Sequence, residues 1–122
     1  MTINPEFQIV EVELDQIVEE IRNFYKPEKW HFITINGTDL GDGKLQIDWF
    51  FSPYGQKNIV KSFRVVVGYD AKIPSILEIV PSAWLAEWEL ADMFGVEVEG
   101  ASRGVFVAPD APQAPLRQET KL

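Results

Sequence analysis

The sequence predicts one α+β domain over residues 1–100, followed by an extended tail over residues 101–122. Its 122 residues, 46% of them hydrophobic, suffice for a single compact core but not for two ordinary domains. Apolar residues recur first at helical spacing, then alternate in three runs, and then return to helical spacing. This order favours an antiparallel sheet, made of a three-strand meander with room for edge strands, and helices packed on one face.

The first predicted elements are a short strand over residues 7–12 and a helix over residues 14–25. Alternation in the strand is imperfect, whereas the helix has a regular apolar face. The apolar residues of that face are Leu14, Ile17, Val18, Ile21, Phe24 and Tyr25. Asp15 is a candidate N-terminal cap, and the helix must end before Pro27, whose ring cannot continue it. An amphipathic helix should therefore follow the strand.

Three runs of alternating apolar residues predict strands over residues 30–35, 45–51 and 63–67. The Asn36-Gly37 pair, followed closely by Gly41-Asp42-Gly43, predicts the first turn. Ser-Pro-Tyr-Gly at residues 52–55 predicts the second turn. Because both connections are short, the three strands should form an antiparallel meander.

Two further helices are expected in the second half of the chain. Ser75 and Glu78 have the spacing of a capping box, which predicts a short helix that Pro81 stops. Ser82 is the expected cap of a longer helix, which Gly95 can end by adopting a left-handed conformation. The tail after Gly100 is rich in proline and buries too little surface by itself to offset its ordering entropy. We therefore expect it to be mobile or to lie along a partner.

Composition excludes several classes of function. The net charge of −8 at pH 7 repels phosphate backbones, so no nucleic-acid partner is expected. The chain has no cysteine, which removes thiolate nucleophiles and cysteine-ligated metal clusters, and its single histidine, His31, cannot form a two-histidine metal site. No apolar run reaches the roughly 20 residues of a membrane-spanning helix, and the amino terminus lacks signal-peptide features. We expect a cytoplasmic protein without direct membrane insertion.

Candidate functional residues are concentrated in residues 84–95. Glu89 and Asp92 lie about one helical turn apart, so they could form an acid/base pair or bind a hard cation, although solvated helix surfaces commonly carry such acids. Trp84 and Trp88 are expected in the core, or as interface anchors if they are exposed. An acidic stretch without an intervening Lys or Arg indicates a basic partner. Its members are Glu78, Glu87, Glu89, Asp92, Glu97 and Glu99.

A motif in this stretch carries a family resemblance. Its residues are Glu87, Glu89, Asp92, Met93, Phe94 and Gly95, after proline-containing runs at 73–76 and 80–83 and before Gly100. Residues 73–107 resemble the 30 kDa subunit family of respiratory complex I, the NADH dehydrogenase, and the related subunits of energy-converting nickel–iron hydrogenases. Trp88 stands in place of the usual Arg, Ala101 in place of a common His or Lys, and Val105 in place of a basic residue or proline. With the short length, these differences favour the energy-converting hydrogenase branch, similar to the Ech group.

The resemblance implies a non-catalytic scaffold subunit of an electron-transport complex. It implies no catalytic, cofactor-binding or metal-binding residue in this chain; iron–sulfur and nickel–iron centres would belong to partner subunits. The partners would be a hydrogenase-like large subunit and iron–sulfur subunits, which would hold the chain on the cytoplasmic side of the cell membrane. The implied partner interface comprises Trp84, Glu87, Glu89, Asp92, Phe94, Gly95 and Arg103.

The residues alone leave two alternatives open. The chain could be a small stand-alone enzyme that uses Glu89 and Asp92 as acid and base, which would require a cleft beside these carboxylates. It could also be an acidic ligand-binding module, for which no residue of the sequence specifies a ligand.

Overall fold

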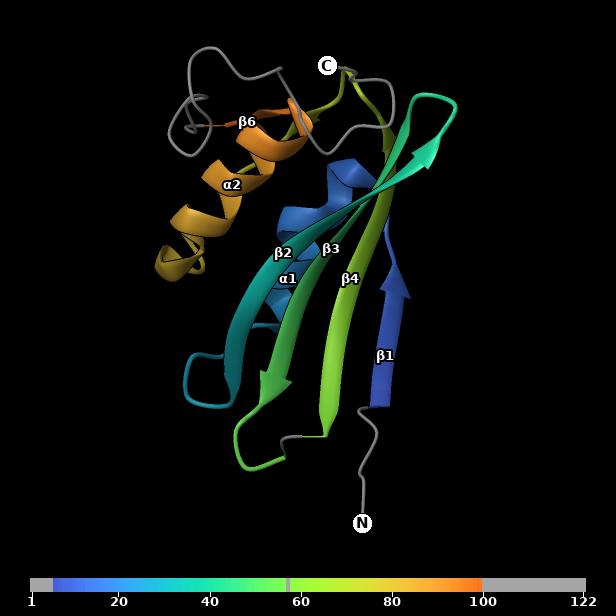
Figure 1. Cartoon of the computed structure of the whole chain (residues 1–122). Helices are drawn as coiled ribbons and strands as arrows, with labels where there is room; N and C mark the ends of the chain where they lie inside the picture. Colours follow the sequence, from blue (N-terminus) through green and yellow to red (C-terminus); the bar gives the residue numbers. More distant parts are fainter. Residues whose placement is uncertain (1–5, 57, 100–122) are drawn as a thin grey trace.

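The computed structural model describes residues 6–56 and 58–99 (Figure 1). The elements in chain order are β1 (Glu6–Glu11), the 3-10 helix η1 (Leu14–Gln16), α1 (Ile17–Phe24), β2 (Trp30–Gly41), β3 (Lys44–Pro53), β4 (Ile59–Gly68), β5 (Lys72–Ile73), the 3-10 helix η2 (Pro81–Ala83), α2 (Trp84–Phe94) and β6 (Glu97–Val98). The tail predicted for residues 101–122 lies outside the described residues, and with it the predicted domain boundary.

The main sheet contains four strands in the order β1-β4-β3-β2 (Figure 1). β2 pairs antiparallel with β3, and β3 pairs antiparallel with β4, so the predicted meander is confirmed. β1 joins β4 as a parallel edge strand. The predicted α+β class is therefore confirmed, with a sheet that is antiparallel except at β1.

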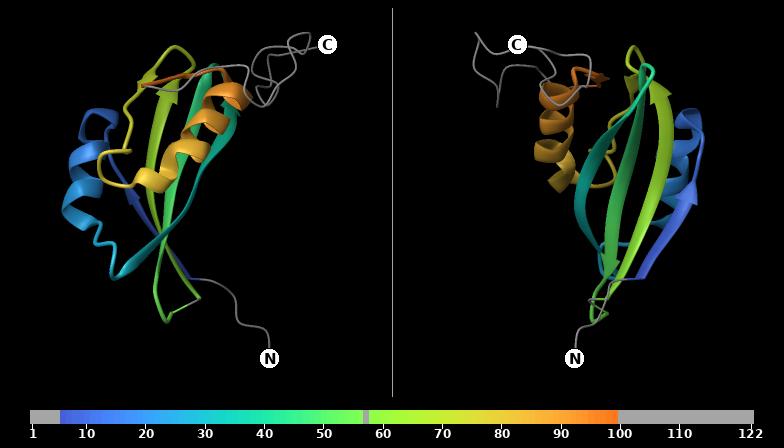
Figure 2. Two further views of the ribbon diagram at one scale, coloured as in Figure 1. Left: turned by 90° about the vertical axis from the view of Figure 1, so that its left-hand side faces the viewer. Right: turned by 45° about the vertical axis from the view of Figure 1, so that its right-hand side comes forward.

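One face of the sheet packs against both helices. α1 contacts β4 and α2 contacts β2, and Figure 2 shows the two helices beside these parts of the sheet. Alternate side chains of a strand point to the same face, so every second residue of β3 enters the core. These core residues are Leu45, Ile47, Trp49 and Phe51. Ile17 and Ile21 of α1 are also fully buried, which explains the regular apolar face of this helix.

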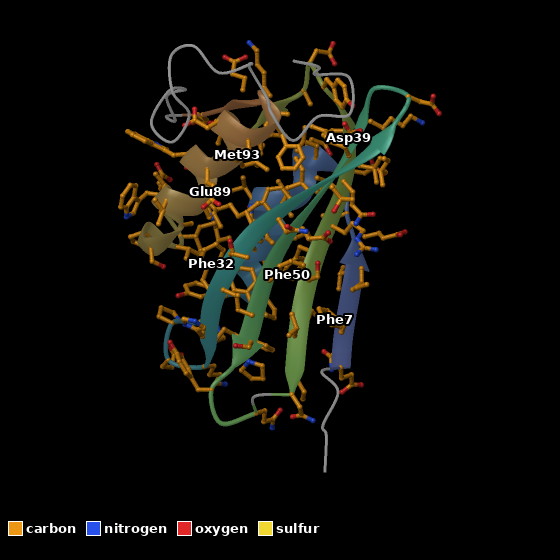
Figure 3. The ribbon with its side chains drawn as sticks, viewed as in Figure 1. Phe7, Phe32, Asp39, Phe50, Glu89 and Met93 are labelled. Atoms are coloured by element: carbon orange, nitrogen blue, oxygen red, sulfur yellow. The ribbon has the colours of Figure 1, made fainter. Side chains whose placement is uncertain are left out.

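No helix in the described part of the chain covers the opposite face of the sheet, which we call the open face (Figure 3). Phe7 of β1 contacts Phe50 of β3 there, with the rings edge to face and their centroids 6.4 Å apart. The same face holds a buried carboxylate. Asp48 Oδ1 accepts hydrogen bonds from the Ser62 hydroxyl and from Arg64 Nε, both at 2.8 Å. The open face thus combines apolar side chains with one buried ion pair.

The prediction of a turn at Asn36-Gly37 is wrong. Both residues lie inside β2, and Gly37 pairs with Ile47 of β3. A Cβ on Gly37 would lie 2.6 Å from Cε2 of Phe94, so the glycine lets α2 approach the strand closely. The other part of the predicted turn, Gly41-Asp42-Gly43, is confirmed, and all three of its residues have a positive φ.

The prediction of a helix beginning at Ser75 is also wrong. Residues 77–79 form only one turn, in which the N–H groups of Ile79 and Val80 both donate to the carbonyl of Ile76. Pro81 does not stop a helix but begins η2. The Ser75 hydroxyl donates to Glu87 of α2, and its oxygen accepts the N–H of Leu77 at the start of the turn.

The predicted side-chain caps are absent from both α-helices, whereas the predicted end of the second helix is confirmed. Asp15 and Ser82 lie inside η1 and η2, and neither α1 nor α2 has a side-chain hydrogen bond at its N-cap. Gly95 ends α2 with a φ of 68°, and its N–H donates to the carbonyl of Ala91 at 2.9 Å.

A second, two-stranded sheet was not predicted. β5 and β6 pair in parallel, with Lys72 opposite Glu97 and Ile73 opposite Val98. The N–H of Glu99 extends the pairing by donating to the carbonyl of Ile73 at 3.0 Å. Two residues per strand are too few to give a sequence pattern. Their pairing joins the segment before α2 to the segment after it.

Candidate functional site

α2 has an inner and an outer side, and both carry apolar residues. The inner side packs on the core through Ala86, Leu90, Ala91 and Phe94. The outer side carries Trp84 and Leu85 at its N-terminal end, 50% and 44% exposed. A helix that packs on only one side normally presents polar residues to water. We call the exposed residues Trp84, Leu85 and Glu89 the outer surface of α2.

The expectation that the paired tryptophans lie in the core is wrong for Trp84. Its ring is half exposed and meets the ring of the partly buried Trp88 edge to face, with centroids 6.1 Å apart. Such contacts contribute about 0.5–1.5 kcal/mol beyond the burial of area, and they fix the orientation of both rings. Trp84 is therefore held in place at the surface.

Glu87 lies on the inner side of α2 and is 1% exposed. Its Oε1 accepts a hydrogen bond from the Ser75 hydroxyl and its Oε2 accepts one from the backbone N–H of Ile76, both at 2.8 Å. The Ser75 oxygen also accepts the N–H of Leu77. One carboxylate thus holds the segment after β5 against the first turn of α2.

Burial is the main influence on the protonation of Glu87. Desolvation raises the pKa of its carboxyl, the hydrogen bonds from Ile76 and Ser75 lower it, and the charge of Glu99 raises it further. Among the residues that the structure describes, no Lys or Arg forms an ion pair with Glu87. Its pKa is accordingly above the ordinary value of 4.5.

Glu89 and Asp92, the candidate acid/base pair, have different surroundings. Glu89 is exposed on the outer side of α2, where Figure 3 labels it, whereas Asp92 is 4% exposed. Three hollows on the described surface have linings that include neither residue. One of them, of about 590 Å³, lies between the β1–α1 connection and β5. None of these hollows provides the cleft that the stand-alone enzyme requires.

The other candidate residues lie in several parts of the fold. Phe94 and Gly95 are buried where α2 meets β2, and Arg103 lies outside the described residues. His31 is exposed on β2, with its ring 6.1 Å from that of Tyr54. Ser75, which the sequence suggested only as a cap, accepts the N–H of Leu77 and is also a partner of Glu87.

The described side chains form no cluster suited to a metal. Within residues 6–56 and 58–99, no group of three or more His, Asp or Glu side chains is arranged to hold a metal ion. The helices of this part of the chain are all too short or too polar to cross a membrane.

The chain is thus a small α+β domain in which two α-helices pack on a mixed sheet. Comparison with known proteins gives its family. Residues 10–122 match the family model described as respiratory-chain NADH dehydrogenase, 30 Kd subunit. The chain belongs to this family, as the motif around α2 predicted.

One solved structure has a closely similar fold. It is a chain in the membrane-bound sulfane sulfur reductase, described as an archaeal respiratory membrane complex. The TM-score is 0.75 at 19% sequence identity, over 98% of this chain and 72% of that chain. At this identity the likeness establishes the fold. A search of curated proteins found no match.

Proposed function

We propose that the chain is a non-catalytic subunit of a membrane-associated redox complex related to energy-converting nickel–iron hydrogenases and NADH:quinone oxidoreductase. In this proposal it docks on the large catalytic subunit and contacts iron–sulfur subunits, which contain the redox centres. The complex holds it on the cytoplasmic side of the membrane. Membership of the 30 kDa subunit family supports the proposal, as does the fold shared with a chain of a respiratory membrane complex.

The exposed outer surface of α2 is the observation that carries the docking proposal. Trp84 and Leu85 expose about half of their area side by side at one end of the helix. Burying apolar area yields roughly 25 cal/mol per Å², and tryptophans dominate many interfaces because each buries a large rigid ring. A partner that covers this end of α2 would therefore gain most of its affinity from these two residues.

Charge supports a basic partner surface. Glu89 lies on the same helix, and Glu78, Glu97 and Glu99 are also exposed in the segments that flank α2. Charges at the rim of an interface mainly speed encounter and select the partner, while apolar contacts at the centre supply affinity. The partner we expect has an apolar groove bordered by Lys or Arg.

Co-purification tests the proposal. The tagged chain is co-expressed with the large subunit and the iron–sulfur subunits encoded with it, and the stoichiometry after purification is measured. The variant Trp84→Ala/Leu85→Ala should weaken association at least about tenfold, since it removes the anchors. Leu40→Ala is the matched control, because Leu40 is 48% exposed but lies near the end of β2, outside α2. Equal recovery of both variants with the large subunit would contradict the docking surface.

The acidic residues need separate variants. Glu89→Lys should slow association and make it less sensitive to salt, because it reverses one exposed charge. Glu87→Gln tests folding rather than docking, since the Glu87 carboxylate bonds within the chain. A double change of Glu87 and Glu89 would mix the two effects.

The hydrogenase branch is tested on the same purified complex. The substitutions at Trp88, Ala101 and Val105 relative to the family pattern favour it. Stoichiometric nickel beside iron in the co-purified large subunit is the expected result. Iron without nickel, together with quinone reduction, would assign the complex to the other branch.

A further inference from the structure

The two edges of the main sheet differ in how they are protected. At the β2 edge, the pairing with β3 is irregular between Phe32 and Thr34 and again between Asp39 and Gly41, and α2 packs against the strand. Irregular pairing and a covering helix are common means of preventing an edge from pairing with another strand. At the β1 edge, the six-residue register with β4 is uninterrupted, and no described strand lies beyond it.

The pairing with β4 determines which backbone groups of β1 point outward. The N–H of Glu6 donates to the carbonyl of Asn58, and the N–H of Val12 donates to that of Arg64. In a parallel pair, backbone groups alternate between the two sides of a strand, so residues 6, 8, 10 and 12 bond toward β4. The N–H and C=O groups of Phe7, Ile9 and Glu11 consequently point away from the sheet.

Side chains at this edge add an apolar strip. Phe7 and Ile9 are 55% and 45% exposed, and their register with Val60 and Ser62 places them on the open face. An edge with free backbone groups and exposed apolar side chains is a template for strand addition. Lysine and proline, which blunt natural edges, are absent from Glu6–Glu11.

Charge indicates what kind of strand fits. Glu6 and Glu11 lie at the two ends of β1, and Glu13 follows closely; all three are exposed. A second copy of this chain would bring the same acids and a net charge of −8. An incoming strand with basic residues at its ends and apolar residues between them complements the edge in both charge and polarity.

We propose that the outer edge of β1 accepts an additional β-strand from another polypeptide, an extended segment with alternating apolar residues flanked by basic ones. This contact is independent of the proposed docking through α2, because α2 contacts β2 at the opposite edge of the sheet. Either contact can therefore fail without affecting the other.

The test uses the full chain and a capped peptide in which valine alternates with threonine and a lysine stands at each end. Amide hydrogen exchange is followed by NMR as the peptide is titrated to saturation. Exchange should slow at least about tenfold at Phe7, Ile9 and Glu11 and stay unchanged at Gln8 and Val10, since only the first three N–H groups gain partners. Protection of both sets, or of neither, would overturn the proposal.

Two variants of one residue sharpen the test. Ile9→Pro removes an outward N–H but no hydrogen bond to β4, so the strand can stay in the sheet while peptide binding weakens at least about tenfold. Ile9→Ala keeps the N–H and should retain most of the binding. Equal binding by both variants would contradict backbone pairing. If Ile9→Pro does not fold, the alternating exchange pattern of the unmodified chain decides.

A twin peptide with glutamate at each end tests the charge argument, because it should bind at least about tenfold more weakly. Equal binding of the twin would overturn the basic character of the strand. The chain without peptide is measured at the same concentrations. Self-association that slows exchange at Phe7, Ile9 and Glu11 would identify a second copy as the occupant and overturn the proposed partner.

Discussion

Asp48 and Glu87 are both buried carboxylates, 2% and 1% exposed, but their surroundings differ. Asp48 lies on the open face of the sheet and pairs with Arg64, whose side chain is 26% exposed. Glu87 lies under α2 and accepts hydrogen bonds from neutral groups, the Ser75 hydroxyl and the Ile76 N–H. The sheet thus compensates a buried charge with an opposite charge, whereas the α2 region compensates one with neutral hydrogen-bond donors.

The difference shows what each carboxylate does for the fold. Asp48 joins residues of β3 and β4 that the sheet already pairs, so its bonds reinforce an existing contact. Glu87 joins α2 to a segment without regular structure, which has few other bonds to hold it. Leaving a buried donor unpaired costs more than losing a redundant bond. We therefore expect substitutions at Glu87 to have the larger effects.

The largest expected effect is that of Glu87→Ala. It leaves the N–H of Ile76 and the hydroxyl of Ser75 without acceptors and opens space under α2, and should lower the free energy of unfolding by about 2–4 kcal/mol. Urea denaturation measures the change. Glu89→Ala, on the exposed side of the same helix, is the control and should change stability by less than about 0.5 kcal/mol. Equal effects would remove the distinction between the two sides of α2.

Gly37→Ala tests the other end of α2, where the helix meets β2. The added Cβ would overlap the Phe94 ring, so the free energy of unfolding should fall by about 1–3 kcal/mol. Phe94→Leu in the same chain should recover part of the loss, because a smaller side chain leaves room for the methyl group. Additive costs in this double-mutant cycle would show that the two residues do not meet.

Asp48→Asn should cost less, about 1–2 kcal/mol in the free energy of unfolding. The amide can still accept the Ser62 hydrogen bond, and the partly exposed Arg64 can turn toward water. The cost should shrink when Arg64 is already replaced by Met, since the ion pair is then gone. A cost larger than that of Glu87→Ala would reverse the comparison.

The smallest expected effect is a dependence on pH. Because burial raises the pKa of Glu87 above 4.5, the folded chain binds this proton more tightly than the unfolded chain. Its contribution favours folding below 4.5 and is lost as pH rises through the raised pKa. Relative to Glu87→Gln, the unmodified chain should therefore lose stability across this range, measured by urea denaturation at successive pH values. A constant difference would mean that the pKa is not raised.

Much of the fold follows from local patterns. Alternation of apolar residues predicts β2, β3 and β4, because burial on one face of a sheet imposes a period of two. The apolar spacing of α1 and the glycine at the end of α2 are equally local. The motif around α2 indicated the family, which the match over residues 10–122 confirmed.

The errors have a common cause in contacts between distant segments. Asn36-Gly37 has the composition of a turn, but Gly37 is required by Phe94, 57 positions later in the chain. Ser75 has the spacing of a cap, but its hydroxyl donates to Glu87. Glu87 and Glu89 belong to the same motif, but the way α2 packs on the sheet buries Glu87 and leaves Glu89 exposed. No single-segment pattern contains this information.

The pairing of β5 with β6 has a consequence for how the protein opens. Residues 72–99 form a loop closed at its base by this ladder and braced across its middle by Glu87. If β5 and β6 separate, α2 loses this constraint while the strands of the β2-β3-β4 meander stay paired. Residues 72–99 should therefore unfold together, as one cooperative unit, at a lower free energy than global unfolding. Partial unfolding would then begin at the C-terminal end of α2, beside β6, and not at the end that carries Trp84.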